Sequence, residues 1–186
     1  MGRGGEHFYM SDTYKVQPDM ITLAKGLGNG APIGAVLTSD PVASSVQGKI
    51  HFNTFGGDPL QSAQALATIE TIEQENLIKN ALKVGKQLKL GFQEFAKRFP
   101  FIGDVRGRGL LIGLELVENL ETKEHSPQKT IQLMEYLKNE GVLVGKGGLY
   151  GNVIRIAPPL SLTHSEAQEI LRAFEKSLDL VQNQSF

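Results

Sequence analysis

A lysine between an apolar run and a glycine-rich turn constrains this chain more than any other feature. The run Met20–Leu23 predicts a buried strand, Lys25 stands near its end, and every second residue of the turn 26–30 is glycine. Burying an ammonium group is costly unless it is paired or loses its proton, so the pKa of Lys25 is expected to be lowered. A neutral amine attacks carbonyl groups, and glycines let the backbone approach a bound cofactor, so this stretch predicts Schiff-base chemistry. An ion-paired or snorkelling lysine is the alternative.

The composition limits the class of protein. The chain has 186 residues, of which 40% are hydrophobic, and this is enough for one large core or two small ones. Nineteen basic against 20 acidic residues give a net charge of −1, so no field attracts nucleic acid or an anionic membrane. No cysteine is present, the four histidines show no metal-ligand spacing, and no apolar run could span a bilayer. We expect a globular protein without metal, nucleic acid or membrane partners.

The first part of the chain mixes short strands with helices. Residues 1–18 carry turn chemistry and predict a loop, and residues 33–38 predict a second strand. A short helix is expected from Ser39 to Val46. Asp58 and Pro59 then mark a capped helix start. The positions expected to form the packed face of that helix are Leu60, Ala63, Leu66 and Ala67.

The pattern changes after residue 80. A second helix, with Leu82, Leu88, Phe92 and Phe95 as its apolar face, is expected to stop at Pro100. Strands are then predicted at 102–106, 110–117, 142–144 and 153–157. The helix opened by Ser126-Pro127, with Ile131, Met134 and Leu137 inward, should end at Gly141. Thr163 to Glu166 form a capping box before a last amphipathic helix. The sequence therefore predicts an α/β fold with a domain transition near residue 80.

Two further segments could bind anions. Thr54 lies in the segment 53–59, which places a hydroxyl and glycine amides before a helix N-terminus. The alternative is an ordinary helix entry, in which Asp58 itself occupies those amides. Arg155 is expected on the strand face opposite its two isoleucine neighbours, near a strand end where a guanidinium can bind a carboxylate bidentately. An internal Asp or Glu partner is the alternative for Arg155.

Four segments together resemble the class III, or omega-type, aminotransferases among the fold-type I pyridoxal-phosphate enzymes. They are Pro18–Gly26, Thr54–Leu60, Asp104–Gly109 and Asn152–Pro159, in family order. The run Gly145–Asn152 resembles most the mitochondrial alanine–glyoxylate aminotransferase subgroup. The resemblance implies a partial large cofactor domain over residues 1–80. It also implies an interdomain helix and a small C-terminal α+β domain over residues 81–186.

The same resemblance implies an activity and a set of roles. The family moves an amino group from an amino acid to a 2-oxo acid such as glyoxylate or pyruvate. Lys25 would form the Schiff base with pyridoxal 5'-phosphate (PLP), and Thr54 would reach the cofactor phosphate of the other subunit of a homodimer. Arg155 would bind the substrate carboxylate, and Asp58 replaces a more common Asn. The implied location is the mitochondrion in a eukaryote and the cytoplasm otherwise.

The first residues raise an alternative. Gly2–Phe8 resembles the segment just after the family's cofactor-binding aspartate, so the chain is expected to begin partway through the family pattern. Without that aspartate the pyridine nitrogen is not held protonated and the electron sink is weakened. The alternatives are therefore an inactive fragment that only associates with full-length subunits, or a PLP lyase or aminomutase of the same fold.

Overall fold

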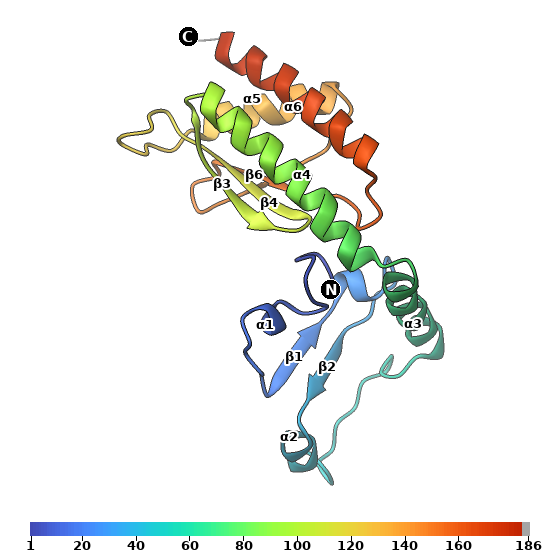
Figure 1. The fold of residues 1–186 in the computed structure, drawn as a ribbon. Helices are drawn as coiled ribbons and strands as arrows, with labels where there is room; N and C mark the ends of the chain where they lie inside the picture. The colour runs from blue at the N-terminus through green and yellow to red at the C-terminus, as the bar shows by residue number, and fades with distance from the viewer. Residues whose placement is uncertain (184–186) are drawn as a thin grey trace. The chain divides into compact units, whose positions relative to one another are not determined.

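The computed structural model describes residues 1–183, which form two compact units that are treated separately below. The first contains Met1–Gly2 and His7–Leu77, and the second contains Arg3–Glu6 and the chain from Ile78 onward (Figure 1). None of the described helices is both long and apolar enough to cross a membrane. The assignment of the two units to a cofactor domain and a small domain stays a prediction.

The first unit is built on a two-stranded antiparallel sheet. Its strands pair from Met20 with Thr38 to Leu23 with Ala35. The short α1 lies within the segment 1–18, so the prediction of an uninterrupted loop there was wrong. The elements are α1 (Met10–Thr13), β1 (Met20–Leu23), the 3-10 helix η1 (Lys25–Leu27), β2 (Ala35–Thr38), α2 (Asp40–Ser45) and α3 (Pro59–Gln74).

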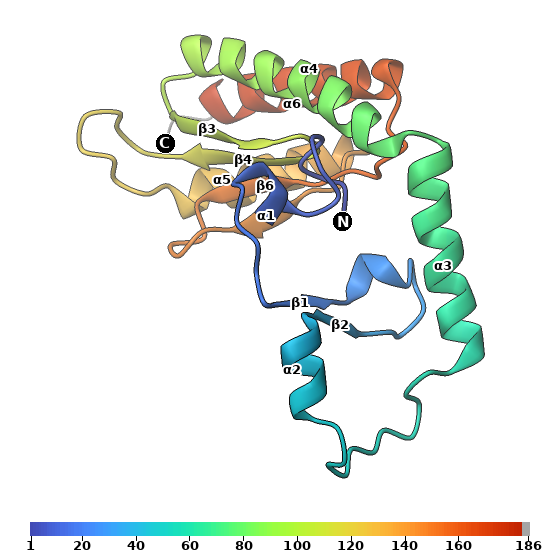
Figure 2. The same ribbon diagram turned by 60° about the horizontal axis from the view of Figure 1, so that its bottom comes forward.

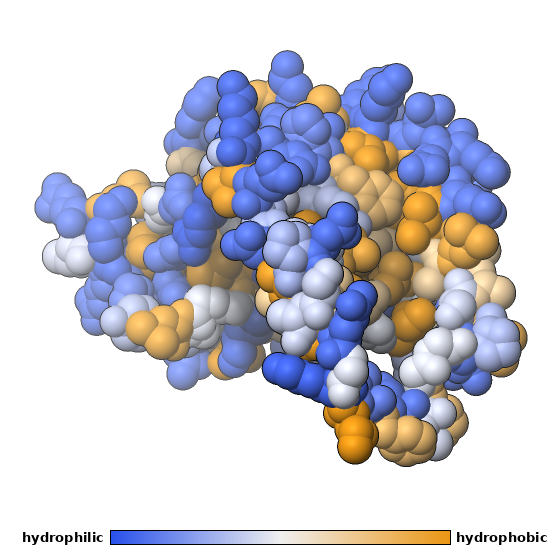
Figure 3. Space-filling view, turned by 90° about the horizontal axis from the view of Figure 1, so that it is seen from below, coloured by the Kyte–Doolittle hydropathy of each residue, from blue (hydrophilic) through white to orange (hydrophobic). Residues whose placement is uncertain are grey.

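Helix α3 begins where the sequence predicts and packs on a different face. Asp58 is its N-cap and Pro59 its first residue, as expected. The four positions predicted to face the core are exposed, and Ala65 and Ile72 are buried instead. An alanine-rich helix has no single strongly apolar stripe, so its neighbours decide which face is covered. Other large apolar side chains also reach the surface, and orange atoms lie among the blue ones in Figure 3.

The second unit is a four-stranded antiparallel sheet covered on one face by three helices. The strand order is β3-β4-β6-β5. Figure 2 shows α4 and α6 lying over the strands. The elements are α4 (Leu77–Arg98), β3 (Ile102–Arg108), β4 (Leu111–Leu116), α5 (Pro127–Asn139), β5 (Gly145–Gly147), β6 (Val153–Ile156) and α6 (His164–Asn183).

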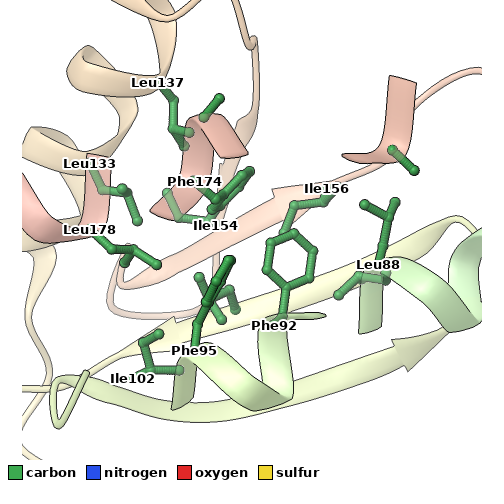
Figure 4. Packing of buried hydrophobic residues seen from close by; sticks show 14 of the residues in the cluster. Leu88, Phe92, Phe95, Ile102, Leu133, Leu137, Ile154, Ile156, Phe174 and Leu178 are labelled. Carbon is green, nitrogen blue, oxygen red and sulfur yellow. The ribbon is translucent and has the colours of Figure 1, made fainter. Parts of the chain in front are cut away.

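The core of this unit lies between the helices and the inner face of the sheet (Figure 4). Phe92 of α4 and Phe174 of α6 are fully buried, with ring centroids 4.8 Å apart in an edge-to-face arrangement. Such aromatic pairs stabilise a core beyond the area they bury. Leu82 and Ile131, which were predicted to face inward, are each 45% exposed. The neighbouring positions in both helices face the core instead, because the packing partners set the helix rotation.

The end of α5 explains why β5 begins later than predicted. Gly141 has a φ of 83°, as expected for the residue that ends the helix. Its amide donates to the Lys138 carbonyl, and the Val142 amide donates to the Leu137 carbonyl at 2.8 Å. These two bonds form a Schellman motif, which uses the Val142 amide for the helix end. The strand predicted at 142–144 is therefore found at Gly145–Gly147.

Candidate active-site residues

Lys25 lies just after β1 in a strained backbone conformation. Its φ of 53° is left-handed, which is uncommon for a residue with a side chain and costs about 1–3 kcal/mol. Strain of this kind persists only where the surroundings hold it. Lys15, Asn29, Asn76 and Lys123 also have a positive φ, so the conformation distinguishes Lys25 only together with the glycine turn that follows it. The side chain is exposed and Met20 of β1 is 54% exposed, so the prediction that Lys25 ends a buried strand was wrong for this chain. The left-handed backbone had no signal in the sequence.

The glycine turn after Lys25 is held by helix α3. The Gly28 carbonyl accepts hydrogen bonds from the Ala31 amide at 3.0 Å and from Gln64 Nε2 at 2.8 Å. Leu27 is 4% exposed and anchors the same turn. Gln64 is thus a residue that positions the lysine loop. Sequence reasoning missed it because a polar residue on a helix gives no sign of a partner 36 positions away.

Thr54 lies in the turn before α3 with an exposed side chain. Asn53 shapes the turn, because its Oδ1 accepts from the Phe55 amide at 3.1 Å. Asp58 Oδ1 accepts from two amides of the first turn of α3, Leu60 at 2.9 Å and Gln61 at 3.2 Å. The helix entry is therefore the ordinary one, and these two amides are not free for a phosphate. Within residues 1–183 the Thr54 hydroxyl has no hydrogen-bond partner.

Arg155 lies on the face of the sheet that the helices leave open. It pairs across β6 with Gly113 of β4 on one side and Gly145 of β5 on the other. Arg106 of β3 lies opposite Gly113 in turn. Directly paired residues share one face of a sheet, so two arginines and two glycines form one row across all four strands. Arg155 is exposed, whereas its neighbours Ile154 and Ile156 are buried, as the alternation predicts.

The two arginines of this row differ in their charge partners. Arg106 donates to Asp104 at 2.8 Å and to Glu115 at 2.5 Å, and these hydrogen bonds raise the pKa of Arg106. No carboxylate pairs with Arg155 anywhere in the described residues, so the internal partner left open by the sequence is not found. Burial first, and then the nearby charge of Arg155, lower the pKa of the Arg3 guanidinium. Of the two arginines, only Arg106 is therefore paired with carboxylates within the described residues.

The three residues singled out from the sequence belong to different elements. Lys25 and Thr54 are both in the first unit, and no hydrogen bond joins their side chains in the part of the chain that is described. Arg155 belongs to the second unit. The described residues contain no cluster of three or more His, Cys, Asp or Glu side chains that could hold a metal ion. The described residues thus provide an accessible amine on Lys25, a hydroxyl without a hydrogen-bond partner on Thr54 and a guanidinium without an acidic partner on Arg155.

Comparisons with known proteins place nearly the whole chain among aminotransferases. The family model described as aminotransferase class-III matches residues 1–178. The mitochondrial alanine–glyoxylate aminotransferase 2 homolog 2 of Arabidopsis thaliana is 41% identical over 172 residues, which are 92% of this chain and 36% of that protein. The chain thus spans about a third of the length of such relatives.

The similar proteins with solved structures include enzymes of more than one activity. An amine transaminase from an uncultivated Pseudomonas species, solved in its PLP-bound form, superposes with a TM-score of 0.88 at 35% identity. It is matched over 97% of this chain and 42% of its own. A phospholyase from Arthrobacter, in complex with phosphoethanolamine, superposes with a TM-score of 0.91 at 34% identity, over 96% of this chain and 42% of its own.

Proposed function

Because the chain belongs to the class III aminotransferase family, we propose that it is part of a transaminase that moves an amino group from an amino acid to a 2-oxo acid such as glyoxylate or pyruvate. The family uses PLP, which supplies an electron sink for the substrate Cα when it is bound. The observation that carries the proposal is the accessible amine of Lys25 directly before a glycine turn that Gln64 holds.

The residues of the first unit fit the cofactor. Lys25 would hold PLP through its amine, and the same amine, once free, would move the proton at the substrate Cα. The Thr54 hydroxyl would donate to the cofactor phosphate, in a partner subunit by family resemblance. Asp58 already accepts two helix amides, so the phosphate would depend on other donors, of which Thr54 is one.

Arg155 would bind the carboxylate shared by the amino acid and the 2-oxo acid. A guanidinium presents its donors in a planar fork that matches a carboxylate. Arg106 lies in the same row and cannot take this role, because Asp104 and Glu115 already occupy it. A single carboxylate site suits both half-reactions, since donor and acceptor each carry that group.

Reductive labelling tests the role of Lys25. The chain is incubated with PLP, reduced with borohydride and mapped by peptide mass spectrometry. Lys15 is a matched control, because it is also exposed and also left-handed, with a φ of 54°. The label is expected on Lys25 in the wild-type chain and in Lys15→Ala, and not in Lys25→Ala. A wild-type chain unlabelled at Lys25 would defeat the proposal and favour a chain that acts only by associating with full-length subunits.

A lyase is the second candidate, because a similar solved structure is a phospholyase. The two reactions differ in what happens to the cofactor. A transaminase leaves the amino group on the cofactor after the first half-reaction, so pyridoxamine phosphate accumulates when only an amino donor is supplied. Finding the eliminated product without pyridoxamine phosphate would favour the lyase.

Assembly and location extend the same proposal. Thr54 acts across a homodimer interface in the family pattern, so we propose a dimer, which sedimentation velocity would detect. The Arabidopsis relative is named as mitochondrial, and we propose the same location if the source is a eukaryote. Fractionation of the source cells would check it.

A further inference from the structure

Gly145 lies against the guanidinium of Arg155. An ideal Cβ placed on Gly145 would be 3.0 Å from Nε, 3.1 Å from Nη2 and 3.4 Å from Cζ of Arg155. A Cβ on Gly147, two residues further along the same strand, would have no heavy atom within 4 Å. Neither glycine has a left-handed backbone. Gly145 is the first residue of β5, and its backbone conformation is one that any residue adopts, so glycine at this position calls for another reason.

The three distances define which part of the guanidinium faces Gly145. A point above the plane of the group would lie closest to the central carbon, Cζ. The Cβ position is instead almost equally far from Nε and Nη2 and farther from Cζ. It therefore lies in front of the Nε–Nη2 edge. That edge carries two parallel N–H groups, which bind a carboxylate bidentately.

We propose that Gly145 is a specificity-determining residue, which keeps this edge of Arg155 open for the substrate carboxylate. The inference rests on the proposed carboxylate role of Arg155. A side chain at position 145 would stand where the carboxylate docks. Gly113, on the other side of Arg155, does not share the role, because a Cβ there would contact Val153 and Arg106 and not Arg155.

Within the row formed by Arg106, Gly113, Arg155 and Gly145, Arg155 is the arginine that remains for the carboxylate. The Arg155 backbone is held between two strands, pairing with Gly113 and Gly145, so only its side chain can turn away from a Cβ added at position 145. Such a turn would move the Nε–Nη2 edge away from the place where it faces Gly145. Arg106 is bound to two carboxylates of the chain. Arg155 is thus the arginine of this row whose donor edge has no carboxylate among the described residues, and a side chain at position 145 would lie against that edge.

Side-chain NMR of the 186-residue chain tests this inference without catalysis. The Arg155 Nε–H signal is assigned by its loss in Arg155→Gln. Pyruvate is then added to the chain, and the uncharged amide of pyruvate is added to a second sample as the control ligand. Pyruvate is expected to shift this signal in the wild-type chain and equally in Gly147→Ala. In Gly145→Ala the affinity should fall about tenfold or more, since charge-assisted hydrogen bonds are lost. The amide should shift nothing.

Each outcome has one meaning. Equal pyruvate affinity in Gly145→Ala and Gly147→Ala would overturn the role of Gly145 and leave that of Arg155 intact. No shift of Arg155 in the wild-type chain would overturn both. If Gly145→Ala does not fold, the backbone amide signals of Gly145 and Gly113 in the wild-type chain test the inference instead. Pyruvate should perturb Gly145 more than Gly113, and the reverse order would refute the inference.

Discussion

Replacing Gly85 by alanine should destabilise the second unit, although alanine favours a helix. Gly85 lies where α4 crosses the turn between β3 and β4. An ideal Cβ there would be 2.1 Å from the carbonyl oxygen and 2.3 Å from the carbonyl carbon of Gly109. Both are main-chain atoms, so no side chain can rotate away to relieve the contact. The helix and the turn would have to separate.

The turn is itself held from its other side. Gly109 has a φ of 50°, and a Cβ on it would be 2.1 Å from the Arg3 carbonyl oxygen. The Leu110 amide donates to that oxygen at 2.9 Å. Arg3 also donates from Nη1 to the Pro158 carbonyl at 2.7 Å, beyond the end of β6. Moving α4 away from the turn would therefore disturb three packed backbone segments, at Gly85, Gly109 and Arg3. Arg3 in turn bonds to the segment that follows β6, the strand of Arg155.

Gly91→Ala in the same helix is the matched control. The three atoms nearest to its Cβ would all belong to the side chain of Leu171, which can change rotamer. Both variants gain the same helix propensity, about 1 kcal/mol, so their difference isolates the backbone clash. Overpacking of this kind costs about 1–3 kcal/mol, and Gly85→Ala should be less stable than Gly91→Ala by that amount.

Urea unfolding followed by far-ultraviolet circular dichroism would measure the difference. The helices α4, α5 and α6 dominate that signal, so it reports on the second unit. The midpoint should fall with little change in slope if the clash acts on the native state. Equal midpoints for the two alanine variants would show that α4 and the turn separate at no cost, and the reasoning from Gly85 would be refuted.

Three further predictions follow from local contacts. Asp58→Ala should destabilise α3 by about 1 kcal/mol through loss of its N-cap, visible as faster amide exchange in the first turn, and unchanged exchange would contradict it. Phe92→Ala should cost about 3–5 kcal/mol in chemical denaturation, because Phe92 is fully buried against Phe174, and a loss under about 1 kcal/mol would count against that packing. The backbone hydrogen bond from Thr163, followed by the hydroxyl bond, lowers the pKa of Glu166 below that of the unfolded chain. The stability advantage over Glu166→Gln should therefore be present at neutral pH and vanish as pH falls through the acidic range, and a pH-independent advantage would refute this cause.

The predictions that were confirmed rest on motifs whose residues are close together in the chain. Thr163 and Glu166 form the expected capping box, with the Thr163 amide donating to Glu166 at 2.7 Å and the Glu166 amide donating to the Thr163 hydroxyl at 3.2 Å. Asp58 caps α3, and Gly141 ends α5 with a positive φ. Each motif is complete within a few residues, so it forms wherever the chain folds.

The predictions that failed concern which face of a helix is buried and where a strand begins. The expected face of α3, Leu82 in α4 and Ile131 in α5 are exposed, because helical periodicity allows adjacent faces and tertiary neighbours choose between them. The strand expected at 142–144 gave way to a helix-end motif that uses the Val142 amide. In both cases a competing contact outweighed a local preference.

The sequence by itself determined the family, the lysine at its glycine turn and the arginine on the polar face of its strand. These depend on residue type and short-range order, which survive without coordinates. Only the tertiary structure decided how the lysine loop is held, through Gln64 and a left-handed backbone. It also decided that Arg155 has no acidic partner among the described residues and faces Gly145 with its carboxylate-binding edge. Such facts depend on the register of strands distant in sequence, and residue order alone does not encode that register in any local pattern.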